Sequence, residues 1–80
     1  MVCLEMLTLE SVKEGGTVVV VDIESKGWAR RLYHMGILPG AELEVIYNRG
    51  KGPVIVRCHG VEVAIGRGIA RRILVKVAEK

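Results

Sequence analysis

Short hydrophobic segments separated by glycines run along most of this 80-residue chain. Residues 17–24 form a nearly continuous β-branched run, which is typical of a central strand with much of both faces covered. Residues 41–48, 53–58, 61–65 and 73–77 instead alternate apolar and polar positions, as in strands with one buried face. The pattern therefore predicts five strands, enough to close or nearly close a small barrel.

Each alternating strand has an expected inward face. The strands predicted over residues 53–58 and 61–65 fit a hairpin, because His59 and Gly60 between them can both take the positive φ of a two-residue turn. The side chains expected to point inward are Leu43, Val45 and Tyr47 in the first alternating strand, Val54, Val56 and Cys58 in the second, Val61, Val63 and Ile65 in the third, and Ile73, Val75 and Val77 in the last.

A helical spacing replaces the alternation after the first strand. Trp28, Leu32 and Met35 recur at i, i+4 and i+7, which predicts an α-helix over about residues 26–35 with these side chains as one apolar stripe. The other faces of this helix form a basic outer surface that carries Lys26, Arg30 and His34.

Both ends of the predicted helix carry recognisable signals. Ser25 is expected to cap the start, with its hydroxyl accepting a backbone N–H that the first turn leaves unpaired. Gly36 is expected to end the helix in the left-handed conformation, with Ile37 folding back onto Leu32. Pro39-Gly40 then fits the two central positions of a type II turn that leads into the next strand.

Two further segments predict single helical turns. One lies within residues 7–16, before a glycine pair, and the other near residues 67–71, between the last two strands. The expected fold class is therefore mainly β: a small five-stranded barrel with one inserted α-helix. A chain of this length has room for one domain, over residues 1–80.

Composition supports this fold and argues against a membrane-spanning protein. Half of the residues are hydrophobic but only three are aromatic, so the core must be built from Val, Ile and Leu. No apolar run exceeds four residues, far below the about 18 that a spanning helix needs. The first ten residues lack the pattern of a secretion signal. We therefore expect a cytoplasmic protein without membrane insertion.

The net charge of +3 and the pI of about 9.1 raise the question of nucleic acid binding. A late basic cluster lacks the interleaved aromatic residues that would stack on bases, so we expect no nucleic acid partner. A solvated face, partly paired with acidic residues, explains the cluster better. The basic residues are Arg67, Arg71, Arg72 and Lys76, and the expected acidic partners are Glu42, Glu44 and Glu62.

No motif for catalysis or for a cofactor is present in the sequence. The segment "RGKGPV" lacks the spacing and the hydroxyl residue of a phosphate-binding loop. Cys58 and His59 are adjacent in a strand and point to opposite faces, so the imidazole would not activate the thiol. We expect a protein that is not an enzyme and needs no cofactor.

The two cysteines and two histidines formally make a Cys₂His₂ set, but their spacing resembles no zinc pattern. We therefore expect no dedicated metal centre, with His59, His34 and Cys58 as weak candidates for surface binding of a transition metal ion. A disulfide between Cys3 and Cys58 is not expected, because cytosolic proteins keep such thiols reduced.

The segments "RRLYHMGILPGAELEVI" and "GPVIVRCHGVEVAIGRGIARRILV" resemble the FeoA family, the small accessory component of bacterial and archaeal ferrous iron uptake. The resemblance extends from "LTLESVKEGG" to "ILVKV". It implies an SH3-like barrel, a domain type that also occurs at the C-terminus of metal-dependent repressors. It further implies no catalytic residues, and a partner in the cytosolic, GTPase-containing region of the membrane ferrous iron transporter.

The leading hypothesis is a cytoplasmic accessory protein that docks on this transporter and modulates it. The expected contact surface combines the basic helix face with a loop, and its residues are Lys26, Arg30, His34, Arg49 and Lys51. The alternative is a small basic SH3-like module associated with RNA or the ribosome, and a third idea is a small metal sensor. Homo-oligomerisation is left open.

Overall fold

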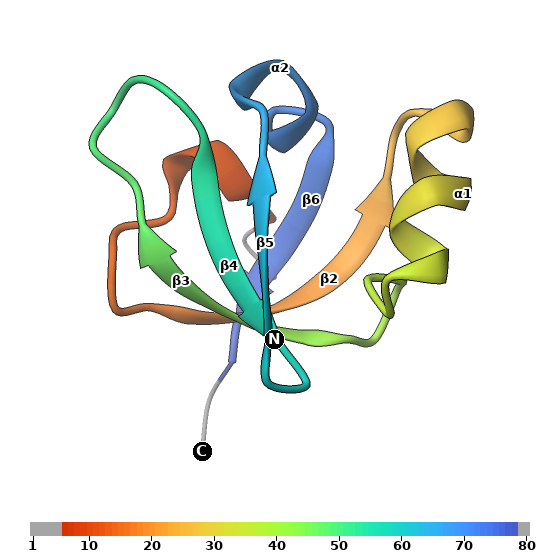
Figure 1. Ribbon diagram of the computed structural model, residues 1–80, viewed down its shortest axis with the longest axis horizontal. Helices are drawn as coiled ribbons and strands as arrows, with labels where there is room; N and C mark the ends of the chain where they lie inside the picture. The colour runs from red at the N-terminus through yellow and green to blue at the C-terminus, as the bar shows by residue number, and fades with distance from the viewer. Residues whose placement is uncertain (1–5, 79–80) are drawn as a thin grey trace, which may run out of the picture.

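The computed structural model describes residues 6–78 as a strongly curved antiparallel sheet with two helices and one 3₁₀ helix (Figure 1). The strands are β1 (Leu7–Thr8), β2 (Thr17–Ile23), β3 (Glu42–Tyr47), β4 (Val54–Cys58), β5 (Val61–Ile65) and β6 (Ile73–Val77). The helices are η1 (Leu9–Ser11), α1 (Lys26–His34) and α2 (Arg67–Ala70). The expected mainly β architecture, the inserted helix and both short helical turns are confirmed.

The sheet contains six strands in the order β1-β6-β2-β3-β4-β5, rather than the expected five. The additional strand, β1, has two residues and pairs Leu7 with Val75 and Thr8 with Leu74. Two residues are too few to show a strand period, so sequence could not reveal it. The long strand β2 pairs with β6 and β3, and its register shifts between Val20 and Asp22. Such a bulge bends a strand and increases its twist, which curls the sheet.

One hydrophobic core fills the inside of the curved sheet. Most of the expected inward positions are buried, including all three of β4. β2 alternates between buried and half-buried residues, with Asp22 alone exposed, so much of both its faces is covered, as expected. The fully buried residues of the sheet include Val18, Leu43, Val45, Val54, Val56, Ile73 and Val75.

Three residues expected to point inward are exposed instead: Tyr47, Val61 and Val77. Tyr47 follows a register shift between Val45 and Tyr47, where one extra residue interrupts the alternation. Val61 follows the hairpin turn and Val77 ends β6, so both lie where the strands leave the core. A strict period of two predicts the direction of a side chain but not where the core ends.

The turn that follows α1 has the predicted geometry. Gly36 has a φ of +89°, and the Ile37 amide donates to the Leu32 carbonyl at 2.8 Å. The type II turn at Pro39-Gly40 is closed by a 2.8 Å hydrogen bond from the Ala41 amide to the Leu38 carbonyl, and Gly40 has a φ of +95°. The Gly40 amide also donates to the β2 carbonyl of Val20 at 2.8 Å, which holds the turn against the sheet.

Two other local predictions had different outcomes. His59 and Gly60 have φ values of 53° and 80°, so the predicted hairpin turn is confirmed. Ser25 does occupy the N-cap position of α1, but its hydroxyl makes no capping hydrogen bond, so that expectation was wrong. Its backbone carbonyl instead accepts the first helical bond, from the Ala29 amide at 2.7 Å.

Candidate functional site

α1 lies at one end of the long axis of the molecule, next to β2 (Figure 1). Leu32 is its one fully buried side chain, with Ala29 packed beside it. The remaining large side chains project away from the core. We call them the α1 surface, which consists of Lys26, Trp28, Arg30, Arg31, Tyr33, His34 and Met35.

The apolar content of the α1 surface is higher than the sequence predicted. Trp28 and Met35 were expected in a buried stripe with Leu32, but they are 38% and 48% exposed, and Tyr33 is 61% exposed. The helical spacing places Trp28 and Met35 on the same side as Leu32. Of these three side chains, only Leu32 is buried in the core.

The α1 surface is also uniformly basic. No acidic residue occurs between Glu24 and Glu42, and no ion pair of the described residues involves Lys26, Arg30 or Arg31. The Arg31 guanidinium lies 5.1 Å from the centre of the Trp28 ring, within cation–π range. Lys26, Arg30 and His34 were expected on this surface from the sequence, whereas Arg31, Trp28, Tyr33 and Met35 were not.

The loop residues that were grouped with α1 lie elsewhere. The loop that joins β3 to β4 carries Arg49 and Lys51 and lies at the opposite end of the long axis from α1 (Figure 1). Arg49 pairs with Glu14 at 3.1 Å, and its guanidinium lies 5.5 Å from the Tyr47 ring centre. The structure therefore does not bring the five predicted contact residues onto one face.

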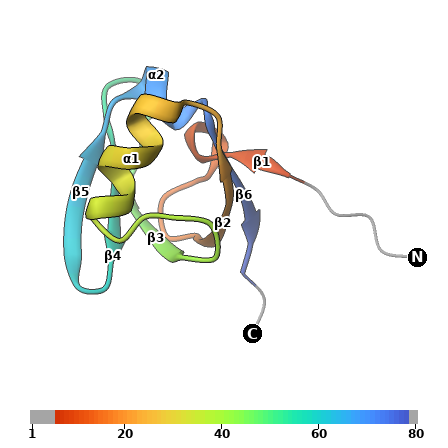
Figure 2. The ribbon, with the colours of Figure 1, turned by 90° about the vertical axis from the view of Figure 1, so that its right-hand side faces the viewer.

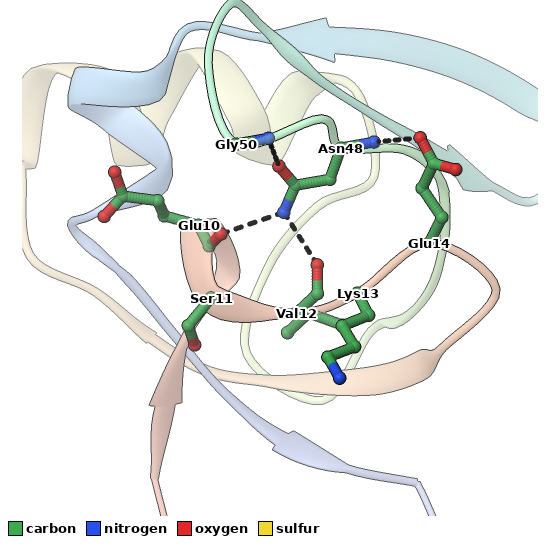
Figure 3. Close-up of a pocket in the computed structure, with 7 residues that line it drawn as sticks. All are labelled: Glu10, Ser11, Val12, Lys13, Glu14, Asn48 and Gly50. Carbon is green, nitrogen blue, oxygen red and sulfur yellow. Dashed lines mark hydrogen bonds between the residues drawn. The ribbon is translucent and has the colours of Figure 1, made fainter.

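Asn48 organises the end of the molecule that carries this loop (Figure 3). Its side-chain amide donates to the carbonyls of Glu10 and Val12 at 2.8 and 2.7 Å. Its side-chain oxygen accepts from the Gly50 amide at 3.2 Å and from Arg67 Nη2 at 2.8 Å. Asn48 and the residues that it bonds in this way, Glu10, Val12 and Gly50, help to line an open pocket of about 440 Å³. Because all polar groups of the Asn48 side chain already have protein partners, the pocket is a structural junction rather than a ligand site.

Two residues of the late basic cluster form ion pairs, but with a different acid from those expected. Arg71 Nε lies 3.1 Å from Glu10 Oε2, and Arg67 Nη1 lies 3.7 Å from the same oxygen. The predicted partners Glu44 and Glu62 instead pair with Arg57, at 3.6 and 2.9 Å. Glu10 lies 57 or more positions away in sequence, and only the barrel topology brings it to α2.

The weak metal candidates do not form a cluster. His59 lines an open pocket of about 300 Å³ with Glu42 and Glu44, yet residues 6–78 contain no group of three His, Cys, Asp or Glu side chains placed to hold a metal ion. Cys58 is buried, and its Sγ lies 3.7 Å from the Gly36 carbonyl oxygen. Burial also raises the pKa of the Cys58 thiol, which disfavours the thiolate that metals bind. Cys3 lies outside the described residues.

Within residues 6–78, no helix is long and apolar enough to cross a membrane.

Comparison with known proteins gives consistent results. The model of the FeoA domain matches residues 7–77. Fe(2+) transport protein A of Methanocaldococcus jannaschii is 45% identical over 75 residues, which cover 92% of this chain and 90% of that protein. A crystal structure of the iron uptake regulatory protein FeoA has a TM-score of 0.84 and 33% identity, covering 94% of this chain and all of that one.

Two more distant structures share the fold. Zinc-complexed FeoA of Stenotrophomonas maltophilia, described as a prokaryotic SH3 domain protein, has a TM-score of 0.77 and 24% identity over 88% of this chain and 89% of that one. A manganese-dependent transcriptional repressor has a TM-score of 0.83 and 23% identity, covering 95% of this chain but 44% of its own. The barrel is thus SH3-like, as the resemblance implied.

Proposed function

This chain belongs to the FeoA family of ferrous iron transport accessory proteins, and from that premise we propose that it docks in the cytoplasm on the membrane ferrous iron transporter and modulates it. The proposed docking site is the cytosolic, GTPase-containing region of the transporter. The proposed contact on this chain is the α1 surface.

The composition of the α1 surface is the observation that carries this proposal. Tryptophan, tyrosine and arginine dominate the energetics of protein interfaces, and α1 exposes Trp28, Tyr33 and two arginines on one short helix. Elsewhere in the described chain, exposed large apolar residues are scattered singly along strands or near the N-terminus. Scattered apolar residues are normal on a monomer, whereas this grouping is typical of a binding surface.

Charge distribution favours the same surface. Most arginines outside α1 are neutralised in place: Arg49 by Glu14, Arg57 by Glu44 and Glu62, and Arg71 by Glu10. Arg30 and Arg31 have no such partner among the described residues, so their charge remains available to a partner. We infer that the matching surface on the transporter is acidic, because complementary charge steers encounter and fixes orientation.

A docking module of this kind acts through binding alone. A partner that binds one conformation of the transporter more tightly than another shifts the population toward that conformation. Modulation of the GTPase region therefore requires no catalytic residue from this chain. The proposal does not include weak binding of a transition metal ion at His59 or His34, because neither histidine belongs to a group of three possible metal ligands within the described residues.

The proposal is tested by co-purification of the tagged full chain with the transporter from detergent-solubilised membranes. Trp28→Ala and Arg30→Glu should reduce recovery of the transporter, whereas Lys51→Glu, at the opposite end of the molecule, should not. Equal recovery with all three variants would contradict the α1 surface.

RNA binding, the alternative function, is examined by filter binding at increasing salt. A submicromolar affinity that falls steeply with salt would favour the RNA module and count against transporter docking. An absence of binding removes this alternative.

A further inference from the structure

β5 forms an outer border of the molecule and leaves one backbone edge open (Figure 2). Within residues 6–78 it pairs with β4 alone, through five consecutive residue pairs from Cys58↔Val61 to Val54↔Ile65. The other end of the sheet is β1, which has only two residues. β5 is therefore the one long strand of the described sheet with a free edge.

The hairpin register determines which backbone groups face that edge. Cys58 and Val61 flank a two-residue turn and so exchange both backbone hydrogen bonds. Hydrogen-bonded and non-hydrogen-bonded pairs alternate along an antiparallel ladder, so Val61, Val63 and Ile65 bond to β4. The N–H and C=O groups of Glu62 and Ala64 consequently point away from β4, toward the free edge.

The edge lacks the features that usually keep edge strands apart. Natural sheets guard such edges with bulges, prolines, lysines or inward charges, and the β4–β5 register is unbroken over a strand without proline or lysine. Glu62 is the only charge on β5, and Arg57 of the same molecule holds it at 2.9 Å. Val61 is 59% exposed and Val63 is only half-buried. Association through this edge would cover both.

We propose that two copies of this chain associate through antiparallel pairing of β5 with β5, about a two-fold axis at Val63. In this register Val63 lies opposite Val63 of the second copy, and Glu62 lies opposite Ala64 of the second copy. The two equivalent Glu62 and Ala64 pairs form four backbone hydrogen bonds and join the two sheets into one. Homo-oligomerisation of this kind is independent of the α1 surface and of the proposed docking partner.

The sequence of β5 is self-complementary about Val63, which favours a second copy as the occupant. The apolar row of Val61, Val63 and Ile65 meets the same row reversed, so Val61 lies opposite Ile65 of the second copy. On the outward face each Glu62 meets an alanine rather than another glutamate, so no like charges lie directly opposite each other. The two-fold axis stands perpendicular to the local sheet, so both α1 helices lie on the same side of the joined sheet.

Sedimentation equilibrium of the full chain, with two matched variants at one exposed position, tests the register. Ala64→Glu places a negative charge opposite Glu62 of the second copy, twice by symmetry, and should raise the dimer dissociation constant about two- to thirty-fold. Ala64→Lys places a positive charge there and should keep or lower this constant, although it increases the net positive charge of each copy. Equal effects of the two variants, or a wild-type chain that stays monomeric at millimolar concentration, would overturn the proposal.

Amide hydrogen exchange by NMR gives an independent readout on the wild-type chain. With increasing protein concentration, exchange at the Glu62 and Ala64 amides should slow, because these amides gain partners only in the dimer. The Val63 amide, already bonded to β4, should change little by comparison. Protection that appears on α1 instead would place the contact elsewhere and refute pairing through β5.

Discussion

The amide nitrogen of Ile37 lies 2.8 Å from the carbonyl oxygen of Leu32, and both side chains are buried. A second bond joins the Gly36 amide to the Tyr33 carbonyl at 3.0 Å, which completes a Schellman ending of α1. Because Leu32 and Ile37 enter the same core, this ending fixes the rotation of the helix about its axis. The orientation of the basic and aromatic side chains of α1 thus depends on residues 32–37 at its C-terminal end.

Replacement of Gly36 by alanine should destabilise the fold by about 1–2 kcal/mol, because a φ of +89° is strained for any residue with a Cβ. Lack of space is not the cause, because an added Cβ would lie 3.4 Å from His59 Cδ2, close to an ordinary van der Waals contact. Urea unfolding measures the effect. Gly27→Ala is the control within the same helix. An added Cβ there meets nothing within 4 Å, so it should be neutral or stabilise by up to about 1 kcal/mol. Equal stabilities of the two variants would contradict this explanation of the turn.

Asn48→Ala should cost about 1–3 kcal/mol, because it leaves the carbonyls of Glu10 and Val12 without their side-chain donor. The same variant should loosen η1 and the β3–β4 loop together, since Asn48 bonds to both. Chemical denaturation measures the free energy of unfolding, and hydrogen exchange at Gly50 reports the loop. Lys51→Ala, at an exposed position of the same loop, should change stability by less than about 0.5 kcal/mol. A comparable loss in Lys51→Ala would show that the loop, not the Asn48 bonds, determines the effect.

The raised pKa of Cys58 leads to a prediction about pH. Burial keeps the folded thiol neutral at pH values where the unfolded thiol already ionises. The contribution of the buried, neutral Cys58 thiol to folding stability is therefore complete below the ordinary thiol pKa. It is lost as pH rises from that value toward the raised pKa of the folded protein. In a Cys3→Ser background, stability should fall over this alkaline range, and Cys58→Ala should reduce the dependence on pH. Rapid alkylation of native Cys58 at neutral pH would contradict a protected thiol.

Sequence predicted the local backbone of this protein well because turns depend on few residues. Gly36, Pro39-Gly40 and His59-Gly60 each require a backbone conformation that few residue types adopt, and all three turns formed as predicted. Periodicity also identified β2, the alternating strands and α1. The two-residue β1 and the extent of the core were missed, because they depend on how the sheet curves.

The contact surface was less predictable for the same reason. Lys26, Arg30 and His34 share a helix, so their proximity follows from spacing alone. The placement of the Arg49 loop at the far end of the molecule, and the pairing of Arg67 and Arg71 with Glu10, follow only from the strand order. The exposure of Trp28 likewise could not be read from helical spacing, which places Trp28 on the same side as the buried Leu32.

Binding of the transporter through the α1 surface is measured by the dissociation constant of this chain for the isolated cytosolic region of the transporter at low salt. Wild type, Arg30→Glu and Lys51→Glu are compared after circular dichroism confirms that all three are folded. Arg30→Glu should raise the dissociation constant about tenfold, equivalent to about 1.4 kcal/mol, while Lys51→Glu leaves it within about twofold. An unchanged constant for Arg30→Glu, or an equal loss for Lys51→Glu, would contradict the account.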